Sequence, residues 1–285
     1  MSGSSLWSKT DVTMLAATSY DSRQNKVHSV YGSTSLSFDN MVYLDLTARN
    51  DWSSALSAVN RSYFYTSASL SFLLDRFLNL DESTFDMLKV RASTANVGND
   101  TEAQQTVNLF SVAANGYLGN VQINRPNIKF SESLRPEDIT TTEFGLEFKM
   151  FQNRLYGDFS YYNITTKDLI FDVPVDPGTG FSFFRENIGE INNKGFEVMI
   201  GGRPISTTNF RWDASLNFSS NKNELVSLIE GQENFQLTSS NSGVVDVRAQ
   251  VGEGFGDIYT TTWRRNEAGQ LLLTAEGRPQ ADRKS

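Results

Sequence analysis

The chain has 285 residues and carries 33 acidic against 25 basic side chains, for a formal net charge of −8. It has no basic run, so nucleic acid is not expected as a partner, because phosphate binding depends on lysine and arginine. The absence of cysteine excludes disulfides, zinc–thiolate sites and cysteine nucleophiles together.

The chain lacks two membrane-related features. Residues 1–10 do not show the charged start and apolar core of a signal peptide. No stretch approaches 18 consecutive apolar residues, which excludes a transmembrane helix. A transmembrane β-barrel stays open, because its strands alternate apolar and polar residues and keep the mean hydropathy low.

Apolar residues recur at every second position in nine segments, which predicts β-strands because successive side chains of a strand point to opposite faces. Residues 224–230 are the only segment for which a helical turn is expected. The sequence therefore predicts an all-β fold. The nine apolar rows lie within residues 12–20, 30–38, 42–48, 64–72, 88–94, 144–150, 155–161, 196–200 and 212–218.

Residues 143–163 show the pattern most clearly. Two alternating runs flank Gln152 and Asn153, which predicts a hairpin with one apolar and one polar face. Alternation alone leaves two alternatives open. The apolar face could pack on a second sheet, as in a soluble or surface-exposed β-sandwich that binds a ligand, or it could face lipid.

The lengths of the connections favour lipid as the neighbour of the apolar face. Tight links are expected at residues 39–41 and 151–154, whereas residues 96–140 and 164–194 are long. Short turns at one end and long loops at the other are typical of outer-membrane barrels. Aromatic residues near the predicted strand ends suit the girdles at the membrane surfaces: Trp52, Tyr63, Tyr65, Tyr161 and Tyr162 at one end, Phe151 and Phe210 at the other.

Ordered blocks of sequence then point to a family. "NRSYFYTSASLSF", "LKVRASTANVGND", "LRPEDITTTEFGLEF", "YYNITTKDLI", "NIGEINNKGFEVMI" and "FRWDASLNFSSNKNELVSL" follow one another between residues 60 and 228. Together they resemble the SusC/RagA family of TonB-linked outer-membrane transporters of the Bacteroidota. Two departures are Arg135, where lysine is usual, and residues 251–256, which lack the proline common in that loop.

The resemblance implies a partial transmembrane antiparallel β-barrel, about nine strands of a larger one, with an apolar face toward lipid and a polar face toward the lumen. Residues 1–219 would form the barrel portion and residues 220–285 a long extracellular loop region that is cut before the next strand. The chain would thus be an internal or C-terminal fragment, without the plug and the TonB-contacting segment.

The implied function is the import of oligosaccharides or peptides across the outer membrane of a Gram-negative cell. The implied partners are a SusD-like surface lipoprotein, the TonB complex, the transported oligosaccharide or peptide ligand, and outer-membrane lipid.

No enzymatic chemistry is predicted. His28 is the only histidine and lies at a strand entry without a flanking motif. Gly252, Gly254 and Gly256 resemble a phosphate loop only superficially, since no Lys-Ser/Thr follows. Asp172 and Asp176 do not fit the EF-hand pattern. No catalytic residue, cofactor or metal is expected.

The most suggestive ligand-contacting segment lies in the connection 164–194. Phe181, Phe183 and Phe184 stand there within "DPGTGFSFFREN". Three aromatic rings in an extracellular loop could form a stacking surface for a sugar or peptide, or touch a lid partner. The alternative is that they fill a small core of the loop or fold onto the barrel rim.

Overall fold

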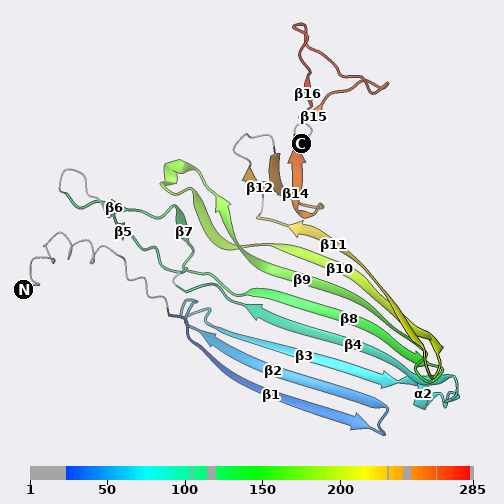
Figure 1. Cartoon of the computed structure of the whole chain (residues 1–285). Helices are drawn as coiled ribbons and strands as arrows, with labels where there is room; N and C mark the ends of the chain where they lie inside the picture. The colour runs from blue at the N-terminus through cyan, green and yellow to red at the C-terminus, as the bar shows by residue number, and fades with distance from the viewer. Residues whose placement is uncertain are drawn as a thin grey trace, which may run out of the picture.

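The computed structural model describes residues 24–103, 105–113, 120–229, 231–239, 245–260 and 262–282. Its main feature is one long, curved sheet with smaller sheets gathered at one end (Figure 1). Eight antiparallel strands follow one another across this sheet. They are β1 (Val27–Phe38), β2 (Val42–Ser53), β3 (Ser62–Leu73), β4 (Phe85–Asn99), β8 (Glu137–Met150), β9 (Leu155–Pro174), β10 (Phe183–Ser206) and β11 (Arg211–Ser227).

The predicted all-β fold is confirmed, and eight of the predicted apolar rows fall in these eight strands. The row at residues 12–20 lies outside the described residues. The ninth strand of the sheet is instead β7 (Ile128–Phe130), which pairs in parallel with the start of β10. The eight long strands and β7 together form an open, partial barrel wall.

The helical prediction is wrong in two places. Residues 224–227 belong to β11, where Leu225 pairs with Ile191 of β10 and is fully buried. A one-turn helix, α2 (Leu74–Phe77), occurs instead in the connection between β3 and β4. Pairing with β10 places residues 224–227 in a strand, and the local sequence pattern does not indicate this pairing.

Tight turns join the strands at one end of the sheet. Asp39 and Asn40 have φ of 50° each, and the Met41 amide donates to the Phe38 carbonyl at 3.0 Å. Two central residues with positive φ form the type I′ turn that matches the twist of a hairpin. The β8–β9 turn is also left-handed, and the Asn153 amide donates to Asp86 at 2.8 Å.

The opposite end carries the longer features. The expected loop at 164–194 is mostly strand, because β9 continues to Pro174 and β10 starts at Phe183, leaving residues 175–182 as the link. The 3-10 turn η1 (Pro177–Thr179) caps this hairpin. Residues 100–136 form a true insertion between β4 and β8, with the short strands β5 (Ser111–Val112), β6 (Ile123–Asn124) and β7.

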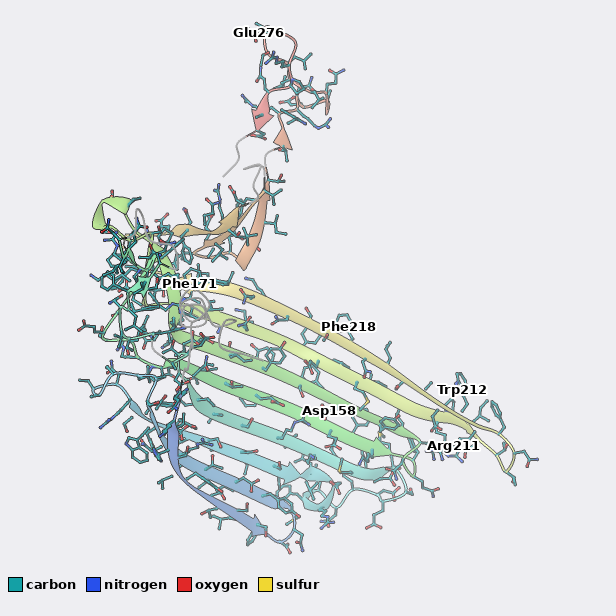
Figure 2. The ribbon with its side chains drawn as sticks, turned by 60° about the vertical axis from the view of Figure 1, so that its left-hand side comes forward. Asp158, Phe171, Arg211, Trp212, Phe218 and Glu276 are labelled. Atoms are coloured by element: carbon teal, nitrogen blue, oxygen red, sulfur yellow. The ribbon has the colours of Figure 1, made fainter. Side chains whose placement is uncertain are left out.

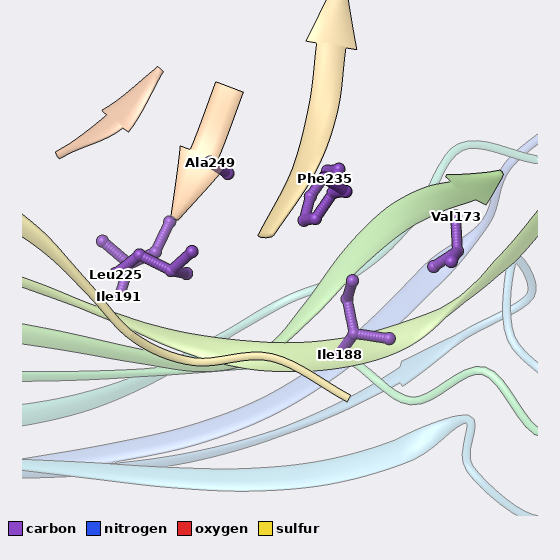
Figure 3. Close-up of a cluster of buried hydrophobic side chains, with 6 residues drawn as sticks. All are labelled: Val173, Ile188, Ile191, Leu225, Phe235 and Ala249. Atoms are coloured by element: carbon purple, nitrogen blue, oxygen red, sulfur yellow. The ribbon is translucent and has the colours of Figure 1, made fainter. Parts of the chain in front are cut away.

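A small sheet packs on the long ends of β9–β11. It comprises β12 (Asn234–Ser239), β13 (Val245–Gln250) and β14 (Phe255–Thr260). Figure 3 shows Phe235 and Ala249 from this sheet facing side chains of the long strands. The core formed between them contains Val173, Ile188, Ile191, Leu225, Phe235 and Ala249.

The last described strands, β15 (Thr262–Trp263) and β16 (Ala281–Asp282), form a two-stranded ribbon that projects away from the wall (Figure 1). The predicted division at residues 219 and 220 falls within β11, which ends at Ser227. That the chain beyond it forms a long extracellular loop region stays a proposal.

The β-sandwich alternative is not supported. Across the described part of the chain, the small sheet β12–β14 packs only against the long ends of β9–β11, and no second layer covers the apolar face of the wall. None of the described helices is long and apolar enough to cross a membrane.

Candidate functional site

The strand pairing places the eight predicted apolar rows that lie within the described residues on one face of the wall. A single cross-strand row runs through all eight strands with an apolar residue at each step, and we call this face the outer face. The row comprises Phe38, Val42, Phe72, Val90, Leu146, Phe159, Val198 and Phe218. Large members stand exposed, with Phe218 at 57%, and Figure 2 shows Phe218 and Trp212 along β11. So extensive an exposed apolar surface requires a cover.

The neighbouring cross-strand row points to the opposite face, which we call the inner face. It has no aliphatic side chain at any of its eight positions: Ser37, Tyr43, Ser71, Arg91, Gly145, Ser160, Glu197 and Ser219. Apolar-out and polar-in alternation over eight paired strands is the pattern of a transmembrane barrel wall around an aqueous interior.

Ion pairs tie neighbouring strands together on the inner face. Arg91 of β4 reaches across β8 to β9, where it makes two hydrogen bonds of 2.7 and 2.9 Å to Asp158. Gly145 lies beneath this side chain, and a Cβ there would sit 2.4 Å from Arg91 Nε. Lys89 and Glu147 pair beside it at 2.6 Å. The inner face is therefore charged and held rigid, as a lumen wall would be.

A shallow cavity of about 300 Å³ opens beside these ion pairs. It is lined by residues of β9, β10 and β11, among them Asp158, Glu197 and Asn217 of the inner face and Val198 and Phe218 of the outer face. Carboxylate and amide groups give it hydrogen-bonding capacity toward polar molecules.

A second polar cluster lies at the rim, where β2 ends. Asp51 is only 4% exposed, and its carboxylate accepts a hydrogen bond of 2.8 Å from Arg49 and another from the Tyr65 hydroxyl. Tyr63 and Tyr65 stack beside each other, with ring centroids 6.0 Å apart. Since both tyrosines share the inner face with Asp51, they do not belong to a lipid-facing aromatic girdle, and that part of the prediction is wrong.

The β9–β10 hairpin bends where it extends beyond the neighbouring strands. Asp168 and Gly189 both have positive φ, of 54° and 70°. The Asn187 side chain fixes the bend, because it accepts a hydrogen bond from the Arg135 amide and donates to the carbonyls of Arg135 and Asp168, all at 2.8 Å. Arg135 also pairs with Asp168 at 2.9 Å. The sequence segments that begin at residues 134 and 187 therefore contact each other at this bend.

The glycine-rich segment 251–256 has a structural role. Gly252 donates to the Leu225 carbonyl at 2.8 Å, and the Leu225 amide donates to Glu253 at 2.8 Å. The Phe255 amide donates to Asn223 at 2.8 Å. The segment is therefore bound to β11 and is not a phosphate loop.

The predicted aromatic residues lie at the tip of the β9–β10 hairpin, and a cation lies near two of the three rings. The Arg125 guanidinium lies 4.7 Å from the Phe181 ring, and Lys129 lies 5.6 Å from Phe184. Phe183 is 39% exposed at the start of β10. The sequence did not indicate these cations, because residues 125–129 come from the distant insertion between β4 and β8.

Below the tip, Arg185 makes two hydrogen bonds of 2.5 and 2.7 Å to Asp172. These bonds raise the pKa of the Arg185 guanidinium. Asp176 caps the 3-10 turn by accepting from the Gly178 amide at 2.6 Å. His28 lies exposed in β1, opposite Trp52. Across the described residues, no group of histidine, cysteine or acidic side chains could hold a metal ion.

Comparison with known proteins gives consistent relatives. A family described as "TonB dependent receptor-like, beta-barrel" matches residues 3–273. TonB-dependent receptor P3 of Formosa agariphila is 32% identical over 244 residues, which cover 83% of this chain and 24% of that protein. TonB-dependent receptor SusC of Bacteroides thetaiotaomicron is 30% identical over 232 residues, covering 78% and 23%. The chain spans about a quarter of the length of these curated relatives.

Among solved structures, that of the RagAB peptide importer in its closed-closed state is similar, with a TM-score of 0.75 and 22% identity. The match covers 91% of this chain and 29% of the solved one. A similarity at this identity concerns the fold, and it confirms that the curved sheet is one sector of a barrel wall.

Proposed function

Because the chain belongs to the TonB-dependent receptor β-barrel family of outer-membrane proteins, we propose that it forms one sector of the wall and extracellular rim of a nutrient importer. The observation that carries this proposal is the register. Eight paired strands present apolar side chains on the outer face and polar side chains on the inner face. This family comprises receptors and transporters, not enzymes, so the polar inner face serves passage of a solute and not catalysis.

The substrate class that we propose is an oligosaccharide or a peptide. The sequence blocks shared with the SusC/RagA family support this class, and so does an inner face rich in hydroxyl, amide and charged groups. Such groups can hydrogen-bond to hydroxylated or amide-containing solutes without burying unpaired charge.

The partners that we propose are the TonB complex and a SusD-like surface lipoprotein. Large solutes do not diffuse through a plugged barrel, and the outer membrane has no ATP, so uptake needs a mechanical link to the inner membrane. The wall sector would contribute to ligand capture and passage, while energy coupling would lie elsewhere in the complete transporter.

We propose that Phe183 contacts the ligand or the lipoprotein lid, and that Phe181 and Phe184 support the tip. Phe183 is the most exposed of the three, whereas a cation packs on each of the other two rings. A cation–π contact at an exposed site contributes about 0.5–1 kcal/mol, enough to help order a loop.

The test is uptake and ligand binding in cells that produce the complete transporter. Phe183→Ala should weaken binding several-fold while the transporter reaches the outer membrane in normal amount. Val59→Ala is the matched control, because Val59 is 89% exposed on another loop. Unchanged binding in Phe183→Ala would mean that this ring has no part in capture. A strain without TonB shows what loss of energy coupling alone does to uptake.

A further inference from the structure

We propose that the polar cluster at the rim of β1–β3 binds a neutral oligosaccharide, at a site formed by three tyrosines and one arginine. This rests on the proposed function and deepens it, because it selects one of the two substrate classes and gives it a place on the wall. Tyr31 of β1, Arg49 of β2 and Tyr65 of β3 are successive partners in one cross-strand row. Tyr63 lies two residues from Tyr65 on the same face.

The row lies where a solute would enter the lumen. It belongs to the inner face, since Tyr31 is an even number of residues from Ser37 on β1 and pairs with Arg49. It also lies toward the end of β2 from which the longer links extend, and in outer-membrane barrels that end is extracellular. A solute that arrives from outside would therefore meet this row before the rest of the inner face.

The tyrosine rings offer faces on which a sugar can stack. Tyr63 and Tyr65 are stacked at an interplanar angle of 22°. Tyr31 is the most exposed of the three, at 76%. The face of an aromatic ring carries partial negative charge, and the C–H groups on one side of a pyranose are weakly positive, so the two surfaces attract each other.

Asp51 is a positioning residue that holds the donors in place. Its nearly buried carboxylate accepts a hydrogen bond of 2.8 Å from Arg49 Nε and another from the Tyr65 hydroxyl. Arg49 also donates to the Ser29 hydroxyl at 2.9 Å. The remaining guanidinium N–H groups stay available to a ligand, because arginine has five donors. Donors that are fixed before the ligand arrives reduce the entropic cost of binding.

The charges at the site suit a ligand without charge of its own. Arg49 and Asp51 form an ion pair of 2.8 Å. Asp100, at the start of the insertion, accepts a hydrogen bond from Ser53, so these three charged groups sum to −1. They offer an anion no excess of positive charge. A sugar hydroxyl donates and accepts hydrogen bonds at once, so it can meet the guanidinium and phenol groups together.

Hydroxyl groups continue from the site toward the opposite end of the wall. Five of the six residues in the next two inner-face rows of β1–β3 bear one: Ser33, Ser35, Thr47, Ser67 and Ser69. The sixth is Asp45, which accepts a hydrogen bond of 2.5 Å from Ser35. The inner face of β4, β8 and β9 carries ion pairs instead. The hydroxyl-rich part on β1–β3 is thus the part that suits the passage of a sugar.

The experiment uses the complete transporter, purified in detergent. Isothermal titration calorimetry would measure binding of maltooligosaccharides, xylooligosaccharides and fructooligosaccharides, with a tryptic digest of casein as the peptide probe. We expect at least one of the sugar probes to bind, and Tyr31→Ala and Arg49→Gln each to weaken that binding about tenfold. Tyr31→Ala removes only an exposed ring, so it tests the site even if Arg49→Gln, which leaves Asp51 buried without its cation, fails to assemble.

Tyr43→Ala is the matched control, because Tyr43 lies on the same face of β2 near its opposite end. It should change sugar binding by less than about twofold. Binding of the peptide digest alone, of no sugar probe, or of a sugar equally well to the Tyr31→Ala variant would overturn the site. Uptake in cells separates this result from the proposed function. TonB-dependent uptake of peptides alone would leave that function standing, whereas uptake that does not depend on TonB would contradict it.

Discussion

At the scale of single residues, Gly189 decides the direction of the longest strand. In a regular strand, side chains three residues apart point to opposite faces, yet Ile188 and Ile191 both enter the same buried cluster. The left-handed backbone of Gly189, with φ of +70°, lies between them and permits this. A Cβ at Gly189 would lie 2.5 Å from the Ser227 carbonyl oxygen, so the position also lacks space.

We expect Gly189→Ala to lower the free energy of unfolding by about 1–3 kcal/mol, because strain and a backbone clash add. Unfolding of the complete transporter in lipid, followed by tryptophan fluorescence, measures the change. Gly231→Ala is the control, since Gly231 also has positive φ, +86°, but nothing lies within 4 Å of its Cβ position. If the two variants lose equal stability, the contact with Ser227 contributes nothing.

The sequence predicts the segments that contain these residues, but it does not indicate which residues they contact. The block from residue 187 to 200 was identified by its resemblance, but the Asn187 bonds to Arg135 join segments 52 residues apart. The same holds for Gly145, which lies beneath the Arg91 side chain. Such contacts depend on strand register, which alternation in one segment does not define.

At the scale of elements, the two faces of a strand should respond differently to charge. Phe218→Lys on the outer face should destabilise the transporter by about 2–4 kcal/mol if the side chain meets hydrocarbon. Ser219→Lys, the next residue, points to the inner face opposite Glu197 and should cost little. Unfolding in lipid bilayers measures both variants. Equal losses on the two faces would contradict the assignment of lipid to the outer face.

The lengths of the strands were predicted well within the wall and poorly at the long ends of β9 and β10. Alternation locates all eight wall strands because one face of each is mostly apolar. It failed at residues 164–194, where the strands continue but the alternation breaks. The bend at Asp168 and Gly189 changes which side chains point inward, so a period of two no longer marks the strand.

Phe235 is the largest buried side chain of the small sheet β12–β14. Phe235 of β12 is 7% exposed and lies 4.6 Å from the Phe171 ring, centroid to centroid. We expect Phe235→Ala to cost about 3 kcal/mol and to detach β12–β14 from the rim, because the ring fills the core between the two layers. Limited proteolysis within residues 228–260 should accelerate while the wall stays protected.

Ile258→Ala on β14 is the corresponding control, because Ile258 is 73% exposed. Its proteolysis rate should equal that of the unaltered protein. Equal protection of the Phe235→Ala variant would show that backbone pairing, such as that of Leu225 with residues 252 and 253, holds the small sheet alone.

At the scale of the whole molecule, the outer face has to be covered. We expect the chain produced alone in water to aggregate, because its apolar row of eight residues meets no second layer among the described residues and β1 is exposed along its whole length. Lipid or detergent should keep it dispersed. Light scattering with and without detergent makes the comparison, and a monodisperse, cooperatively melting species in water alone would contradict it.

The insertion between β4 and β8 has a consequence for how such proteins can diversify. Asn99 and Glu137 are direct partners, so residues 100–136 leave and re-enter the wall at adjacent points. Lengthening a loop whose ends already meet costs only about 0.6 kcal/mol per doubling. Because the β4–β8 ladder continues to the opposite end below this point, the segment can change in length while β7 keeps its pairing with β10. A new recognition surface can therefore evolve in the part of the insertion that precedes β7 while the paired strands of the wall stay as they are.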